Sequence, residues 1–274
     1  MADFSMVGGG ANAIEGGFDY TATSGKTITA SGTADTVGTY VEMVASGDND
    51  FTSEEVYIVI MGPGPTSDAT FLVNIALGTS DTVIIPNLFA WRSAANSGDS
   101  IYIYHFPVRI NSGEAIKAGC QSSVASATVD VHIIRPKKSL PGFVGGGAVT
   151  AYGANTADTG GTAVVRGGAN AFGSWTEIDA NIDEEIKGFV VAAIRPVTSW
   201  GTGRLTFDVG VGSGTPEIIY SGHLIHNSGD ERSQGSITPF IGVSVAEGER
   251  LAIQAQAELA NTDYDFDYII YGVR

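Results

Sequence analysis

Apolar and polar residues alternate along much of this chain, and the alternation is most regular over residues 205–211. There, four large apolar residues are separated by Thr, Asp and Gly. A period of two is typical of a β-strand with one buried face. A glycine-containing turn and a short β-branched run at 218–219 follow. The segment therefore predicts a β-hairpin.

The same pattern occurs earlier in the chain, at residues 71–77 and 83–85. Shorter features recur as well, because Gly32 and Gly38 have counterparts in Gly167 and Gly173. The chain is therefore predicted to be a duplication of one domain of about 135 residues. The boundaries follow from the repeat: a first domain at 1–136, a Gly/Pro linker at 137–149 and a second domain at 150–274.

Each half contains eight candidate strands separated by turn residues. In the first half they lie near 26–31, 39–45, 55–61, 70–77, 82–86, 101–110, 114–121 and 128–134. In the second they lie near 162–166, 174–180, 187–194, 205–211, 217–220, 236–245, 249–257 and 264–272. Helical turns are expected at most near 87–95 and 183–187. The predicted fold class is all-β, with two tandem jelly-roll-like antiparallel β-sandwich domains.

A glycine-rich segment precedes each domain, because residues 6–11 recur as residues 143–148. Consecutive glycines are flexible unless a partner fixes them. We expect the first segment to be an arm that docks on a neighbouring subunit, formed by Val7, Gly8, Gly9 and Gly10. The second is interpreted as part of the linker, which leaves two arrangements open: closed rings of quasi-equivalent sandwiches, or domains that move independently.

Composition excludes several classes of function. The net charge of −16 would repel a phosphate backbone, so no nucleic-acid partner is expected. Neither a signal peptide nor an apolar run long enough to span a membrane is present in the sequence, so no membrane association is expected. The one cysteine, Cys120, lies on the apolar side of an alternating run and is interpreted as a core thiol.

The candidate catalytic motifs are weak. Glycines at 210–214 follow a strand but precede another strand rather than a helix, which favours a turn over a phosphate loop. Ser100 ends a turn sequence that recurs at 227–230 without the serine. His223 and His226 lack further ligands for zinc and are interpreted as exposed loop residues. We therefore predict a protein that is not an enzyme and has no cofactor.

Two groups of residues are candidates for ligand contacts. Asp263, Asp265 and Asp267 alternate with aromatic residues and would lie on one face of a strand, where a loop could complete a calcium site; a solvated or subunit-facing acidic row is the alternative. Trp91 and Trp200 are expected in loops, where exposed aromatics could contact a ligand.

Several of these segments carry a resemblance to a known group of proteins. They are residues 38–42 and 173–177, the strand at 71–78 and its repeat at 205–212, the Val-Ile-Ile-Pro run at 83–86, and Pro107 with residues 116–121. In these segments the chain resembles virion structural proteins of tailed bacteriophages, which are small β-sandwich modules of the tail or decoration type. The second copy departs at Tyr220, where the first has Pro86. The resemblance implies a component made in the host cytoplasm and built into a particle.

The expected function is therefore that of a non-enzymatic virion structural protein. It would form homo-oligomers on a phage particle, as trimers or hexamers, with other virion proteins as further partners. One alternative is a receptor- or glycan-binding module of a phage fibre or tail, with a host glycan as its partner. The second alternative is a tandem jelly-roll capsid protein. The expected location in every case is the virion.

Overall fold

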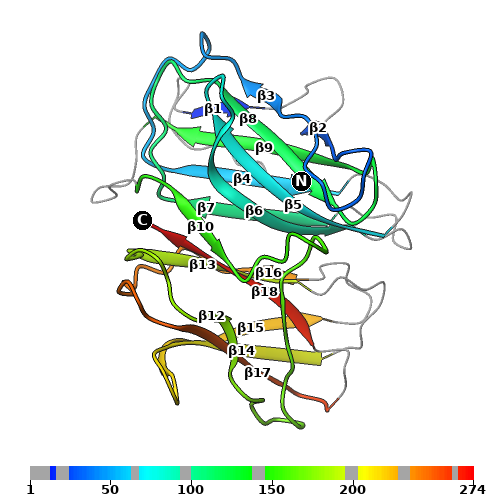
Figure 1. Ribbon diagram of the computed structural model, residues 1–274, viewed down its shortest axis with the longest axis vertical. Coiled ribbons are helices and arrows are strands. Elements are labelled where there is room, and N and C mark those ends of the chain that lie inside the picture. The colour runs from blue at the N-terminus through cyan, green and yellow to red at the C-terminus, as the bar shows by residue number, and fades with distance from the viewer. Residues whose placement is uncertain are drawn as a thin grey trace.

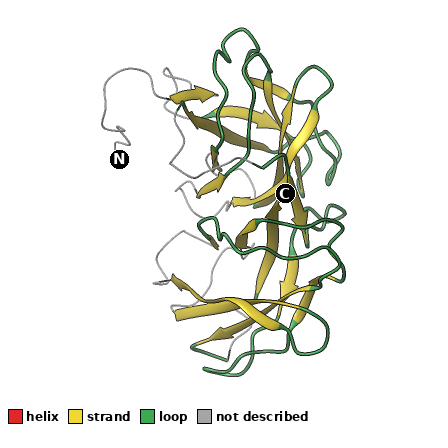
Figure 2. Cartoon of the chain, turned by 90° about the vertical axis from the view of Figure 1, so that its left-hand side faces the viewer, coloured by secondary structure: helices red, strands yellow, loops and turns green. Residues whose placement is uncertain are grey.

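The computed structural model describes residues 13–16, 25–62, 68–92, 100–137, 146–194, 203–227, 235–260 and 265–274, which form eighteen strands and no helix (Figure 1, Figure 2). The first half contains β1 (Ala13–Gly16), β2 (Lys26–Thr29), β3 (Val41–Val44), β4 (Val56–Met61), β5 (Ala69–Leu77), β6 (Thr82–Arg92), β7 (Ile101–Phe106), β8 (Ile116–Ser122) and β9 (Thr128–Pro136). The second contains β10 (Val149–Tyr152), β11 (Thr162–Val164), β12 (Thr176–Asp179), β13 (Gly188–Ile194), β14 (Gly203–Val211), β15 (Glu217–Asn227), β16 (Gly235–Ile237), β17 (Leu251–Ala257) and β18 (Phe266–Val273).

Each half forms one sandwich of a five-stranded and a four-stranded sheet. In the first domain the five-stranded sheet has the order β1-β9-β4-β7, and β2 pairs with β9 on the same edge as β1. The four-stranded sheet has the order β3-β8-β5-β6. The second domain repeats this order as β10-β18-β13-β16, with β11 on β18, and β12-β17-β14-β15. The chain passes from sheet to sheet between most consecutive strands, as in a jelly roll. The predicted fold is confirmed.

The strands β6 and β15 are longer than the sequence predicted, because each continues through a bulge. Asn87 in β6 and Gly222 in β15 both have a positive φ, of 55° and 75°. Their N–H groups donate to the side chains of Asn74 and Asp208, at 2.8 and 3.1 Å. A bulge of this kind bends a strand without ending it. The helical turn expected near 87–95 is wrong for residues 87–92, which belong to β6, and residues 93–95 lie outside the described part.

The second expected helical turn, near 183–187, is also absent, because Ile186 pairs with Val245 in an isolated antiparallel bridge. Among the described residues, no helix is long and apolar enough to cross a membrane.

The two domains pack against each other and share a hydrophobic core. The five-stranded sheet of the second domain covers its own four-stranded sheet with one face and the β6–β7 edge of the first domain with the other. In Figure 1 its strands β10, β13, β16 and β18 lie directly below β6 and β7. Every residue of β13 is consequently buried. The face toward the first domain consists of Val149, Val190, Ala192, Ile194, Ile269, Tyr271 and Val273.

Tyr271 closes the open edge of the first sandwich between β6 and β7. Its hydroxyl donates to the carbonyl of Asn87 and accepts the N–H of Phe89, both at 2.8 Å. Its ring meets Tyr104 and Phe106 edge-on, at centroid distances of 5.5 and 5.9 Å. Burying an aromatic side chain of this size contributes roughly 1.5–3 kcal/mol, and the hydrogen bonds fix its position.

The described end of the predicted linker is held in place. The N–H of Gly146 donates to the carbonyl of Pro107 at 2.6 Å, and its carbonyl accepts the N–H of Arg109 at 3.1 Å. A Cβ at Gly146 would lie 2.3 Å from the carbonyl oxygen of Arg274, so no larger residue fits. The domains therefore form one packed unit and not the independently moving pair that was the alternative.

Candidate functional site

One loop in each domain crosses from the five-stranded to the four-stranded sheet, at residues 30–40 and 165–175. The two loops share several features of their backbone. Asp35 and Asn170 both have a φ of 55°. Their N–H groups donate to the backbone carbonyls of Ser122 and Ala257 respectively, each at 2.8 Å. Asp and Asn tolerate this left-handed conformation better than most residues, which explains their presence in both copies.

A glycine near the end of each loop touches the backbone at the point where the loop begins. A Cβ at Gly38 would lie 2.2 Å from the carbonyl oxygen of Thr29, and one at Gly173 would lie 2.3 Å from that of Val165. Both glycines also donate their N–H to the neighbouring strand of the four-stranded sheet, to the carbonyls of Cys120 on β8 and Ala255 on β17, each at 2.9 Å. Close backbone approach therefore requires glycine at both positions.

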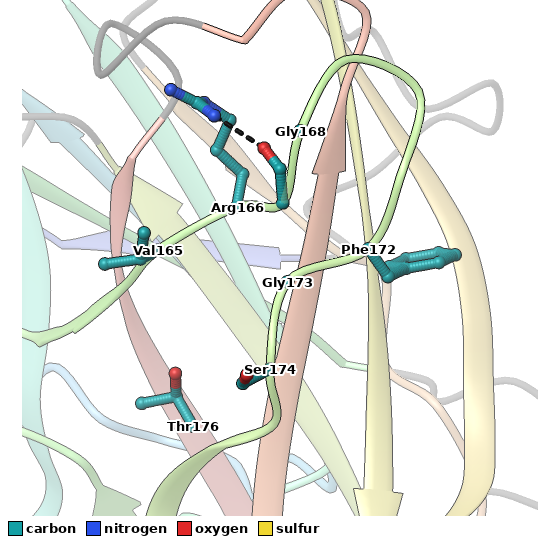
Figure 3. A pocket seen from close by; sticks show the side chains of 8 residues that line it. Val165, Arg166, Gly168, Phe172, Gly173, Ser174 and Thr176 are labelled. Atoms are coloured by element: carbon teal, nitrogen blue, oxygen red, sulfur yellow. Dashed lines mark hydrogen bonds between the residues drawn. The ribbon is translucent and has the colours of Figure 1, made fainter.

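A surface groove lies beside each of these loops, at the same place in the two domains. The first has a volume of about 520 Å³ and the second about 480 Å³. The first is lined by Thr29, Ala30, Ser31, Gly32, Val37, Gly38, Thr39 and Val41. The second is lined by Val165, Arg166, Gly167, Gly168, Phe172, Gly173, Ser174 and Thr176 (Figure 3).

The second groove has an apolar rim and one charged residue. Val165 and Phe172 are 62% and 40% exposed. In Figure 3 Arg166 turns back over its own loop, where Nη1 donates to the carbonyl of Gly167 at 2.5 Å. The backbone N–H of Arg166 donates to Asp265 at 3.2 Å, and its Nε lies 4.0 Å from the same carboxylate oxygen. The guanidinium is thus held by neighbouring groups at the groove's edge.

The chemistry of these grooves suits binding rather than proton transfer. The residues that line the first groove include no acid or base, and those of the second include only Arg166. Among the described residues, the flanking strands pair on one side each: β2 with β9 and β3 with β8, and in the second domain β11 with β18 and β12 with β17. Strands with an unpaired side offer backbone donors and acceptors to a ligand.

The structure corrects one of the two aromatic ligand contacts predicted from the sequence. Trp91 is not in an exposed loop, because it lies in β6 and is 2% exposed in the shared core. The sequence placed it in a loop because the strand was taken to end at Pro86. Trp200 lies outside the described residues.

The acidic row is described in part. Asp265 accepts the N–H of Arg166, as above, and Asp263 lies outside the described residues. Burial raises the pKa of Asp267 to about 6, although a hydrogen bond from the backbone of Gly161 works in the opposite direction. Among the described residues no group of three or more His, Cys, Asp or Glu side chains is arranged to hold a metal ion. The calcium site stays a prediction.

The remaining candidates fall in different environments. Cys120 is fully buried, and burial raises its thiol pKa to about 12, which confirms a core thiol. His223 and His226 lie on β15 and not in a loop, so that part of their interpretation is wrong. Ser100 is buried beside β7. The predicted assembly arm, Val7, Gly8, Gly9 and Gly10, lies outside the described residues.

The repeated loop glycines were visible in the sequence, but they indicated only a duplication. Gly38 and Gly173 line the two grooves, and so do Gly32 and Gly167. Sequence reasoning missed the grooves because a glycine in a turn and a glycine under a groove have the same pattern. Their recurrence in both copies was the available signal.

Fold and grooves together define a two-domain jelly-roll protein with a duplicated surface site. No family model matches the sequence, and no curated protein matches it. Among solved structures the chain is similar to PNGF-II, with 9% identity, 96% of this chain and 65% of that chain covered, and a TM-score of 0.40. It is also similar to PNGase F, a glycosylasparaginase from Flavobacterium meningosepticum, with 12% identity, 96% of both chains covered and a TM-score of 0.35.

These matches contradict the function expected from the sequence. The solved structures named above, PNGF-II and PNGase F, are not virion proteins. The expected phage structural role, with its fibre and capsid alternatives, is therefore wrong. The resemblance to phage modules was based on strand and turn patterns, which many jelly rolls share. At these identities and TM-scores the matches bring no activity to this chain.

Proposed function

We propose that this chain is a non-enzymatic binding protein that holds extended polypeptide segments at its two equivalent grooves. The observation that carries the proposal is the duplication of the site: groove, glycine contact and loop hydrogen bonds recur at the same positions of both domains. Both domains have kept this site although most of their side chains differ.

The chemistry of the ligand follows from the groove walls. Strands with an unpaired side can add a further extended strand through backbone hydrogen bonds. Hydroxyl groups of Thr39 and Ser174 stand at equivalent positions and can bond a peptide backbone without selecting a charge. Since the two sites belong to one packed unit, a ligand with two binding segments would gain from their fixed spacing.

Peptides selected from a random library on the immobilised protein test this proposal. Thr39→Trp and Ser174→Trp each fill one groove at an exposed position. We expect two bound peptides per wild-type chain by isothermal titration calorimetry, one per single variant and none for the double variant. Thr82→Trp, exposed at the start of β6, is the matched control. Peptides that bind the double variant as well as the wild type, or a library without binders, would refute the proposal.

A further inference from the structure

The contact between the two domains uses two different surfaces. One is the β6–β7 edge of the first domain, where Asn87 and Phe89 receive Tyr271. The other is the outer face of the second domain's five-stranded sheet, whose residues Val190, Ala192 and Ile269 are fully buried. Because the domains are repeats, each surface has a counterpart elsewhere in the same chain. Neither counterpart is used within the chain's own domain contact.

The counterpart of the covered face is the outer face of β9, β4 and β7 in the first domain. Tyr57 pairs with Ile134 there, as Ala192 pairs with Ile269 in the second domain. This outer face carries an apolar group that is only partly covered: Tyr57, Val59 and Met61 are half-buried, and beside them Ile101 and Ile103 are 58% and 49% exposed. Polar residues border the group, because His132 and Asp130 lie opposite Val59 and Met61 on β9. An apolar group of this kind on a sheet face is typical of an interaction surface.

The sequence of β4 supports the same conclusion. All six residues of Val56–Met61 are apolar, as in the covered strand β13, Gly188–Ile194. A strand with one solvent-exposed face alternates apolar with polar residues, whereas a continuous apolar run is typical of a strand that is buried on both faces. In β4 the outward residues are only half-buried. The composition of this strand therefore fits a sheet with a partner on its outer face.

The counterpart of the β6–β7 edge is the β15–β16 edge of the second domain. Leu224 pairs with Thr206 there, as Phe89 pairs with Leu72 in the first domain. Phe89 is fully buried by the domain contact, whereas Leu224 is 57% exposed. The bulges at Asn87 and Gly222, described above, are equivalent as well. Among the described residues, each half of the internal contact thus has one partly exposed copy.

We propose that chains associate head to tail, the β15–β16 edge of one copy covering the outer face of β9, β4 and β7 of the next. The occupant is a second copy because the internal contact already joins equivalent surfaces of the same two domains. Such a contact is heterologous, since the two surfaces differ, and it propagates into a closed ring or a filament according to the rotation between copies. A net charge of −16 opposes association, so salt strengthens it by screening.

Complementary variants test the two surfaces separately. Ile103→Arg places a charge on the receiving face, and Leu224→Arg places one on the inserting edge; both positions are exposed, so the fold is retained. We expect the sedimentation coefficient of the wild type to rise with concentration in analytical ultracentrifugation, and each variant alone to remain a monomer. An equimolar mixture of the two variants should form a dimer and nothing larger, because one intact edge meets one intact face.

The mixture distinguishes this arrangement from others. Val83→Arg, exposed at the start of β6 away from both surfaces, should associate like the wild type. A wild-type chain that stays monomeric at every concentration and salt level overturns the proposal, and so does a mixture that remains monomeric. If association appears only after removal of residues 1–12, the chain's own N-terminal segment covers the face instead, and the proposal is wrong.

Discussion

Replacing Asp267 with Asn is expected to stabilise the protein at neutral pH. Asp267 lies on β18, where burial raises its pKa from 3.8 to about 6. The raised pKa means that the folded state disfavours the carboxylate relative to the unfolded chain. A difference of about two pKa units corresponds to roughly 3 kcal/mol. Partial exposure of the side chain reduces this to about 2 kcal/mol.

The sign of the pH dependence follows from the direction of the shift. Well below pH 3.8 the carboxyl is protonated in both states, and its burial is not penalised. As the pH rises toward 6 the unfolded state releases its proton first, so the wild type loses stability relative to the variant. Above that pH the difference is complete. The amide introduced by Asp267→Asn keeps an oxygen that can accept the backbone N–H of Gly161, so the substitution removes the charge and retains the hydrogen bond.

Urea unfolding followed by circular dichroism at pH 4, 6 and 7.5 measures the difference between the two proteins. We expect a gain of less than about 1 kcal/mol at pH 4 and of about 2 kcal/mol at pH 7.5 for Asp267→Asn. Glu258→Gln, at an exposed position, controls for the general relief of negative charge. A gain that is the same at all pH values would show that ionisation of Asp267 is not its cause, and a loss at neutral pH would show that the carboxylate is stabilised as an anion. Calcium that stabilised the wild type but not the variant would support the predicted metal row instead.

Three further changes test the packing. Tyr271→Phe leaves the N–H of Phe89 without its partner in a buried interface and should lower the free energy of unfolding by about 1–3 kcal/mol; an unchanged urea midpoint would contradict the described contact. Cys120, whose pKa burial raises to about 12, should react with Ellman's reagent only as the protein unfolds, and rapid labelling of the native state would speak against a core thiol. Gly38→Ala should destabilise by about 3 kcal/mol in thermal or urea unfolding, whereas Gly47→Ala, where a Cβ meets nothing within 4 Å, should change stability by less than about 1 kcal/mol; equal effects would refute the close approach.

The fold could be predicted because each strand of a sandwich core leaves a period of two in the sequence. Residues 205–211 are an example, since Leu205, Phe207 and Val209 are all buried on the inner side of β14. Strand ends were harder to predict. The sequence placed a strand end at Pro86, but the Asn74 side chain accepts the N–H of Asn87 and β6 continues. Such a side-chain contact lies 13 positions away and leaves no local pattern.

The grooves and the domain contact depend on which faces meet, and a single strand pattern does not specify that. Trp91 was expected to be exposed because its neighbours suggest a loop, yet it is buried in the core that the two domains share. Likewise, the apolar run of β13 indicates that both faces of the strand are buried, but it does not show which part of the chain packs on the second face. Long-range packing of this kind can be inferred from sequence only when a repeat offers a second example for comparison.

The repeat also explains why the proposed contact between chains should be weaker than the contact within a chain. Tyr271, which enters the first domain's edge, has Pro136 as its counterpart, since each lies two residues beyond the paired positions Ile269 and Ile134. Proline has neither the aromatic ring of Tyr271 nor the hydroxyl that forms hydrogen bonds with Asn87 and Phe89. On the β15–β16 edge the position equivalent to Phe89 is occupied by the smaller Leu224. The contact between chains therefore lacks two buried hydrogen bonds and an aromatic cluster, each worth about 1 kcal/mol or more. The internal contact is consequently permanent, while association between chains is set by their concentration.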